Sequence, residues 1–179
     1  MKVLLDANVL YPTVLRGVLL GVARKGLFVP LWSPRILEEW ARAVARNHPE
    51  QAGQVRVEIA QLELAWPRAS IDPRPRDLNR LVLPDPADVH VLAAAIAGSA
   101  NMILTQNARD FPRHTLTEEG LSRQDADAFL RAMWAEAPGE VAEVVEAERG
   151  LAETVIGEPV STRTLLKRAR LPRLAKAVG

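Results

Sequence analysis

The stretch Lys2-Val3-Leu4-Leu5-Asp6-Ala7-Asn8, at the start of the chain, decides the fold. Its apolar run is short and continuous, which is typical of a buried strand in a parallel sheet. The run stops at Asp6, and Asn8 follows two residues later. An acid at the end of a strand is often only a turn former, so this stretch alone leaves a functional role for Asp6 open. We interpret the stretch as a strand that ends in a functional loop.

Working outward, apolar runs alternate with helical patterns. Helices are expected over 12–26, from Ser33 to just before Pro49, over 52–65 and over 87–98, and strands over 27–32 and 102–105, with a shorter strand near 69–71. Ser33 followed by Pro34 is a typical helix start, because serine caps and proline fits the first helical position. Alternation of this kind predicts a three-layer α/β/α sandwich with a parallel central sheet.

The last third of the chain differs in charge. Residues 118–158 are rich in glutamate and aspartate, whereas 161–179 contain six lysines and arginines and no acid. Helical patterns continue over 122–136, near 140–148 and over 164–170. The change of sign indicates a separate unit. We therefore expect an α/β domain over 1–115 and a helical C-terminal extension over 116–179. The extension either caps the fold, binds a partner or, through its basic tail, holds RNA.

Acidic, amide and hydroxyl side chains recur where the predicted strands end. These are Asp6 and Asn8 after the first strand, Glu39 on the helix after the second, Asp85 and Asp88 at the start of a later helix, and Thr105, Asn107 and Asp110 after the last strand. The carboxyl ends of parallel strands meet at one edge, where ligands bind. Oxygen-rich clusters suit Mg²⁺ or Mn²⁺, which can activate water against a phosphodiester.

Structural roles can also account for some of these residues. Asp85 and Asp88 have the spacing of a helix-capping pair, and capping is the leading explanation for Asp85. Glu39 can pair along its helix with Arg35 or Arg42. Asp88 is harder to explain in this way, because its helix is apolar nearly all round and a buried acid needs a partner.

Residues 1 to about 115 resemble the PIN domain. The resemblance rests on LLDANV at 4–9, SP at 33–34 followed by LEEW at 37–40, LPDPADVHVLAAA at 83–95 and ILTQNARDFP at 103–112, and their order and spacing make it specific. It implies a Mg²⁺- or Mn²⁺-dependent nuclease acting on single-stranded RNA. Many members are VapC-type toxins, which implies a small antitoxin protein as a partner, and family members often form homodimers.

By position, the resemblance implies an acidic set of Asp6, Glu39, Asp88 and a fourth group from the 107–110 loop. Many relatives have aspartate at position 107, but this chain has Asn107, and Asp110 is the nearest acid. We predict that the catalytic, metal-binding residues are Asp6, Glu39, Asp88 and Asp110, with Asn8, Asp85, Thr105 and Asn107 in supporting positions. Arg109 and Arg113 are the best candidates for phosphate contacts, because their loop flanks the site.

Two alternative functions remain. A phosphatase that phosphorylates Asp6 would need a lysine for the phosphoryl group, and no lysine lies between Lys25 and Lys167. A non-catalytic module that binds RNA or protein is favoured only by the missing acid at position 107. The absence of cysteine excludes disulfides and thiolate zinc sites. The chain lacks both an apolar run of about 18 residues and a signal-peptide start, so we expect no membrane span and a cytoplasmic protein.

Overall fold

The computed structural model describes residues 1–179. By its internal contacts, the chain divides into two compact units. The sheet unit comprises Met1–Tyr11 and Val29–Gln124, and the helical unit comprises Pro12–Phe28 and Asp125–Gly179. This division differs from the one expected from charge, because 12–28 joins the C-terminal helices and 116–124 stays with the sheet.

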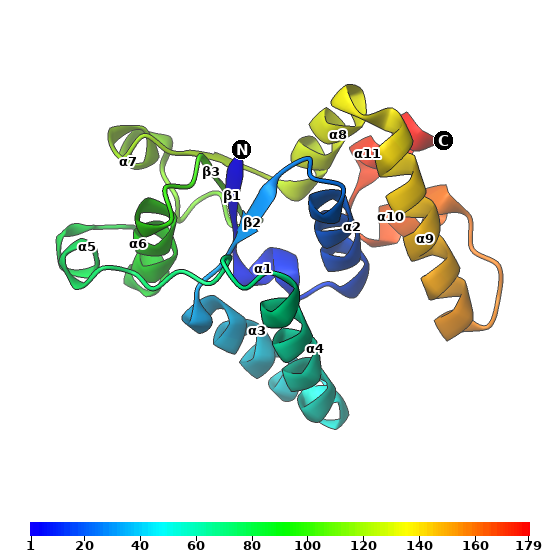
Figure 1. The fold of residues 1–179 in the computed structure, drawn as a ribbon, viewed down its shortest axis with the longest axis horizontal. Coiled ribbons are helices and arrows are strands. Elements are labelled where there is room, and N and C mark those ends of the chain that lie inside the picture. Colours follow the sequence, from blue (N-terminus) through cyan, green and yellow to red (C-terminus); the bar gives the residue numbers. More distant parts are fainter. The chain divides into compact units, whose positions relative to one another are not determined.

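The sheet unit is built on four parallel strands in the order β2-β1-β3-β4 (Figure 1). The strands are β1 (Lys2–Leu5), β2 (Val29–Leu31), β3 (Met102–Leu104) and β4 (Ser122–Gln124). In the register, Leu4 lies opposite Leu31 on one side and Ile103 on the other. The chain first adds β2 to one side of β1 and later adds β3 to the other. The carboxyl ends of β1 and β3 therefore form the switch point at which parallel α/β folds bind ligands.

Six α-helices belong to the sheet unit: α1 (Ala7–Leu10), α3 (Pro34–Asn47), α4 (Ala52–Ala65), α5 (Pro75–Arg80), α6 (Val89–Ala97) and α7 (Arg113–Glu118). The expected cap of α3 is confirmed, since Ser33 accepts a hydrogen bond of 3.2 Å from the backbone of Ile36. Helix α6 packs against β1 and β3, and α3 packs against α1 and α4. Two 3₁₀ turns, Pro49–Gln51 and Pro86–Asp88, precede α4 and α6.

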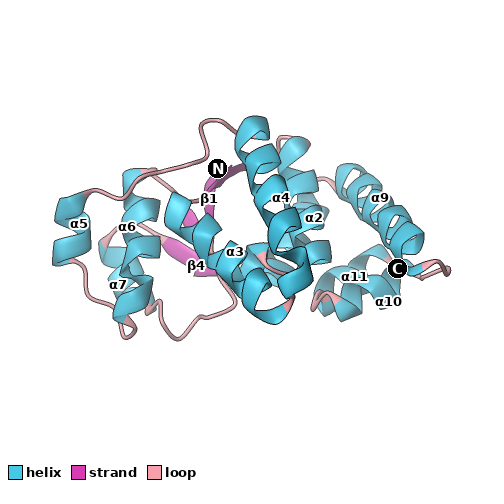
Figure 2. Cartoon of the chain, turned by 90° about the horizontal axis from the view of Figure 1, so that it is seen from below, coloured by secondary structure: helices cyan, strands magenta, loops and turns pink.

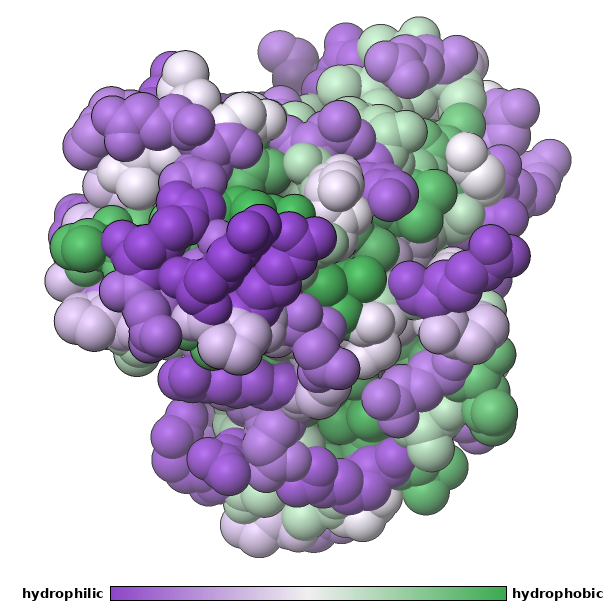
Figure 3. Space-filling view, turned by 60° about the vertical axis from the view of Figure 1, so that its left-hand side comes forward, coloured by the Kyte–Doolittle hydropathy of each residue, from purple (hydrophilic) through white to green (hydrophobic).

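The core of the sheet unit lies between the strands and α6. Val3, Leu4 and Leu5 are fully buried, as are Ile103 and Leu104. Burial on both faces explains why these strands have continuous apolar runs rather than alternating ones. On the face of the molecule drawn in Figure 3, hydrophilic residues cover much of the surface and hydrophobic residues show between them.

The helical unit contains α2 (Thr13–Arg24), α8 (Ala126–Glu136), α9 (Pro138–Ile156), α10 (Thr162–Arg168) and α11 (Pro172–Val178) (Figures 1 and 2). Helix α2 packs closely on α9 because Gly21 has no side chain, and an added Cβ there would lie 2.5 Å from Val144 Cγ1. The carboxylate of Asp127 accepts hydrogen bonds from the backbone N–H groups of Arg173 and Leu174, at 2.9 and 3.0 Å, and so ties α8 to the start of α11.

The parallel α/β fold with C-terminal helices is confirmed, and several local predictions are corrected. The helix expected from Ser122 begins at Ala126, because 122–124 form β4. The strand expected near 69–71 is reduced to a single bridge between Trp32 and Ser70. The short elements α1, α5, α7 and α11 were not predicted. None of the helices combines the length and the apolar character needed to cross a membrane.

Candidate metal centre

Asp6 lies at the switch point, directly after β1, and caps α1. One carboxylate oxygen, Oδ1, accepts a hydrogen bond of 2.7 Å from the backbone of Ala7. The other, Oδ2, accepts bonds of 2.6 Å from Asn8 Nδ2 and 2.8 Å from Thr105 Oγ1. The backbone N–H of Asp6 also donates to the carbonyl of Leu104 at 3.1 Å, which joins the ends of β1 and β3. Both carboxylate oxygens are therefore held in place by groups at the strand ends.

Asn8 and Thr105 form a network around Asp6. Asn8 Nδ2 donates to Thr105 Oγ1 at 3.1 Å, and Asn8 Oδ1 accepts from the backbone of Gln106 at 3.0 Å. Thr105 Oγ1 also accepts from the backbone of Asn107 at 3.0 Å. The network thus connects β1 to the loop after β3. Both side chains donate to the carboxylate of Asp6, and their supporting role beside a metal ligand stays a prediction.

Asp6 is almost fully buried, with only 6% of its surface exposed. Burial raises its pKa above the ordinary aspartate value, and the negative charge of Glu39 raises it further. The hydrogen bonds from Thr105 and Ala7 lower the pKa but do not offset the burial. A buried carboxylate of this kind is stabilised by a nearby cation.

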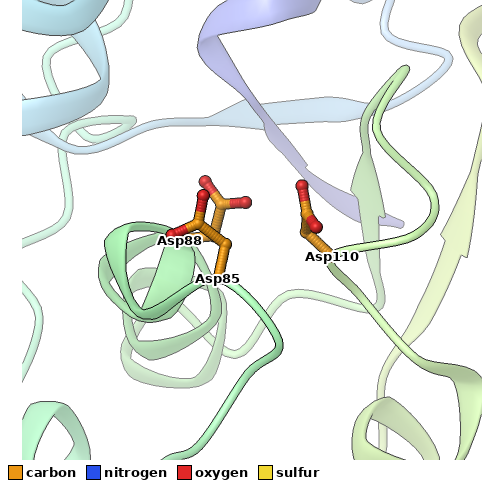
Figure 4. Close-up of side chains that lie close together, drawn as sticks. All are labelled: Asp85, Asp88 and Asp110. Atoms are coloured by element: carbon orange, nitrogen blue, oxygen red, sulfur yellow. The ribbon is translucent and has the colours of Figure 1, made fainter.

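Asp85 and Asp88 lie at the two ends of the 3₁₀ turn that precedes α6. The capping role expected for Asp85 is confirmed, since its Oδ1 accepts a hydrogen bond of 2.8 Å from the backbone of Ala87. Asp88 is half-buried, and Asp110 approaches from the loop after β3 (Figure 4). One carboxylate oxygen from each of Asp85, Asp88 and Asp110 lies within 4.8 Å of the others. Asp85 therefore both caps the 3₁₀ turn and belongs to this acidic cluster.

The pKa of Asp88 is raised to about 6. Burial is the largest cause, followed by the negative charges of Asp6, Asp110 and Asp85, while His90 acts in the opposite direction. The carboxylates thus repel one another without a cation. Hard divalent cations such as Mg²⁺ and Mn²⁺ prefer charged oxygen ligands, and these donors fit such an ion.

Asp110 is the acidic residue of the 107–110 loop that lies in the cluster. Asn107 Nδ2 donates a hydrogen bond to Asp110 Oδ2, and the backbone of Asp110 donates to the carbonyl of Asn107 at 3.3 Å. The structure thus brings Asp110 into the acidic cluster and places Asn107 beside it. Arg109 and Arg113, the predicted phosphate contacts, are exposed on this loop and at the start of α7.

Glu39 lies outside the group of three and has other partners. Its Oε1 is 3.2 Å from Arg35 Nε, four residues earlier on α3, and 2.9 Å from Nε2 of His90 on α6. The latter distance is that of an ion pair with a protonated histidine, and neither ring nitrogen of His90 has a hydrogen-bond partner. Burial raises the pKa of Glu39, but His90 and then Arg35 lower it more, so the net pKa is below the ordinary value. A ligand role for Glu39 stays a prediction.

His90 is a residue that sequence reasoning passed over. It is the one polar side chain within α6 and is 98% buried, and it faces Glu39 from a helix that is otherwise apolar. Its isolation in the apolar run 89–97 was the available signal, but no metal-ligand spacing accompanied it. Only the tertiary structure, in which Nε2 of His90 lies 2.9 Å from Glu39 on α3, reveals its partner.

A parallel sheet with clustered carboxylates at its switch point defines a class of metal-binding α/β domain. The sequence matches the family model described as PIN domain over residues 2–109. The chain therefore belongs to the PIN-domain family, whose members are typically metal-dependent nucleases. Comparisons with curated proteins and with solved structures find no match.

Proposed function

We propose that this protein is an endoribonuclease that cuts single-stranded RNA with Mg²⁺ or Mn²⁺ held by Asp6, Asp88 and Asp110. The observation that carries the proposal is the mutual proximity of Asp85, Asp88 and Asp110, together with the pKa of Asp88, which the charge of Asp6 helps to raise. These carboxylates come from three segments of the chain, one with Asp6, one with Asp85 and Asp88, and one with Asp110, and they meet at the switch point of the sheet. Helix capping accounts for one hydrogen bond each of Asp85 and Asp6, but it does not explain the positions of Asp88 and Asp110.

The metal ion and the residues around it would have separate roles in this reaction. When bound, the divalent ion supplies charge neutralisation at the phosphodiester and a lowered pKa for a water molecule. Asp6 holds a fixed position because Asn8, Thr105 and Ala7 donate to it. Asp110 is oriented by Asn107. Glu39, whose pKa is lowered, stays ionised and adds negative charge near Asp6.

The distribution of lysines favours a nuclease over a phosphatase that forms an aspartyl phosphate on Asp6. Such a phosphatase needs a lysine to hold the phosphoryl group, and the nearest lysines in sequence are Lys2 and Lys25. The amine of Lys2 donates to the carbonyl of Gly98 at 3.2 Å and so is otherwise engaged.

The biological role within this proposal is that of a toxin inhibited by a small antitoxin protein. Its support is the resemblance of 1–115 to the PIN domain, many members of which are VapC-type toxins. We expect that co-expression with the protein encoded by the neighbouring gene relieves growth inhibition caused by the chain. Growth inhibition that is equal with and without the neighbour would remove the toxin–antitoxin role and leave the nuclease proposal intact.

The nuclease proposal is tested with purified protein and an unstructured RNA of about 30 nucleotides. Cleavage is measured with Mg²⁺, with Mn²⁺ and with a chelator, and the ends are mapped by sequencing. We expect internal cuts that need the metal and disappear in Asp88→Asn. Arg68→Gln, an exposed change elsewhere in the sheet unit, serves as a control. Cleavage that persists in the chelator, or at an unchanged rate in Asp88→Asn, would show that another site or a contaminant cuts the RNA.

A further inference from the structure

The end of the chain forms a folded basic surface in the helical unit. We call α10, the turn after it and α11 the basic hairpin. Its exposed cations are Arg163, Lys167, Arg168, Arg170 and Lys176, and none of them has an ion-pair partner in the structure. The sixth cation, Arg173, is 3.4 Å from Asp125. By contrast, Lys25, Arg42 and Arg56 each pair with a glutamate.

The basic hairpin is a packed element rather than a loose tail. Leu165 and Leu166 bury one side of α10, and Leu174 and Ala175 bury one side of α11 against α8. Arg163 and Lys167 lie four residues apart and so share a face of α10, away from its buried leucines. Arg168 is set to one side, where it lines a hollow together with Glu148. The cations are therefore presented at fixed positions by a helical scaffold.

The backbone of the turn between α10 and α11 is strained at one residue, which lowers the stability of the fold. Arg170 has a φ of 61°, in the left-handed region, where it follows the C-terminal end of α10. The N–H of Leu171 donates to the carbonyl of Leu166 at 2.8 Å, as in the helix ending at which glycine is usual. The chain has glycine at three other left-handed positions, Gly26, Gly120 and Gly157. A non-glycine residue here costs about 1 kcal/mol, and no ion pair of Arg170 within the protein offsets it.

We propose that the basic hairpin binds the phosphate backbone of RNA, a role that rests on the proposed ribonuclease function for the choice of polyanion. Unpaired cations fixed on one scaffold, with no acid in 161–179, are suited to phosphate contacts. The segment also contains no aromatic residue on which bases could stack. The surface therefore adds affinity without sequence preference, and it raises the affinity for substrate rather than the rate of the chemical step.

The main test measures the binding of a fluorescein-labelled, 20-nucleotide unstructured RNA in the presence of a chelator, so that no cleavage is needed. The triple variant Arg163→Gln/Lys167→Gln/Arg170→Gln is compared with wild type over a range of salt concentrations. Each lost phosphate contact lowers the salt slope by about 0.7, so we expect a decrease of about 2 in slope and weaker binding at low salt. The matched control is Lys25→Gln/Arg42→Gln/Arg56→Gln, which removes the same charge from paired positions and should keep the slope.

A second variant separates the side chain of Arg170 from the integrity of the fold. Arg170→Gly removes the cation and the left-handed strain together, so it should raise the melting temperature and weaken RNA binding. Ser99→Gly is its control, because Ser99 also has a left-handed φ, of 52°, but lies in the sheet unit. That change should raise the melting temperature and leave RNA binding unchanged. Opposite signs for stability and binding cannot arise from misfolding.

Several outcomes would overturn the role of the basic hairpin. One is an RNA affinity and a salt slope in the triple variant that equal those of the wild type. Another is a loss of RNA affinity in the matched control that equals the loss in the triple variant. Tighter binding of polyglutamate than of RNA of equal charge would assign the surface to an acidic protein. The result is independent of cleavage: an inactive chain that loses RNA affinity in the triple variant would contradict the nuclease proposal and support the hairpin. If the chain cuts RNA and the triple variant has an unchanged KM, the nuclease proposal is supported and the role of the basic hairpin is contradicted.

Discussion

At the scale of single residues, the two best-placed carboxylates should respond differently to the same substitution. Asp88 is repelled by Asp6, Asp110 and Asp85, and its carboxylate has no hydrogen-bond donor in the structure. Asp6 accepts three hydrogen bonds through its two oxygens. An amide offers only one acceptor oxygen, so Asp6→Asn leaves at least one donor facing another donor.

We therefore expect Asp88→Asn to stabilise the metal-free protein at pH 7.5 and Asp6→Asn to destabilise it by about 1 kcal/mol, the cost of an unpaired buried group. Both variants should lose metal-dependent cleavage. Urea unfolding in a chelator measures the two changes in the free energy of unfolding. Destabilisation by Asp88→Asn would contradict the repulsion inferred within the cluster.

The raised pKa of Asp88 also sets a pH dependence. Its pKa is about 6 in the folded protein, against an ordinary aspartate pKa of 3.8. The folded state thus binds this proton more tightly than the unfolded state does. The stabilisation from this group is complete below pH 4 and is lost as the pH rises through 6. In a chelator, the wild type should lose stability relative to Asp88→Asn between pH 4 and 7, measured by melting temperature. Parallel pH profiles would show that Asp88 has no raised pKa.

The two candidates in the 107–110 loop are distinguished by metal affinity. Asp110 contributes a charged oxygen to the cluster, whereas Asn107 donates its amide to Asp110. A hard cation prefers the charged oxygen, so Asp110→Asn should weaken Mn²⁺ binding more than Asn107→Ala does. Calorimetric titration of Mn²⁺ measures both affinities. Equal affinities in wild type and both variants would exclude this loop from the metal centre.

At the scale of elements, the close packing of α2 on α9 depends on Gly21. An added Cβ would meet Val144 at 2.5 Å, whereas a Cβ at Gly150, within α9, meets nothing within 4 Å. Gly21→Ala should therefore destabilise the protein by about 1–3 kcal/mol through overpacking. Gly150→Ala should stabilise it by about 1 kcal/mol, because alanine is the better helix former. Denaturant unfolding compares the two, and the same sign for both would contradict the packing of these helices.

At the scale of the whole molecule, the C-terminal helices complete the core of the helical unit. Leu166, Leu171 and Leu174 are almost fully buried, and α11 packs on α8. A truncation after Gly157 removes this apolar cover and exposes partners on α8 and α9. We expect the truncated chain to bind a hydrophobic dye and to aggregate, whereas the charge variants of the basic hairpin keep a cooperative melt. A truncated chain that melts cooperatively at the wild-type temperature would show that 158–179 are dispensable for folding.

The sequence by itself determined the parallel α/β fold and the acids Asp6, Asp88 and Asp110 as candidates. Such features are local: an apolar run predicts a buried strand, and an acid that follows it predicts a position at the carboxyl edge. The cap formed by Asp85 could be predicted for the same reason, because a capping side chain and the backbone N–H that it accepts from lie within a few residues of each other. Strand β4 could not be predicted from the sequence. Ser122, Arg123 and Gln124 form a short polar segment whose strand conformation depends on its pairing with β3.

Only the tertiary structure decided which side chains meet. The contact of His90 with Glu39 joins residues on α6 and α3, and the entry of Asp85 into the acidic cluster depends on the loop that carries Asp110. The inclusion of α2 in the helical unit depends on glycines that let α9 approach. Each of these contacts joins residues far apart in the chain. Their formation depends on the packing of whole elements against one another, and no local pattern of residues encodes that packing.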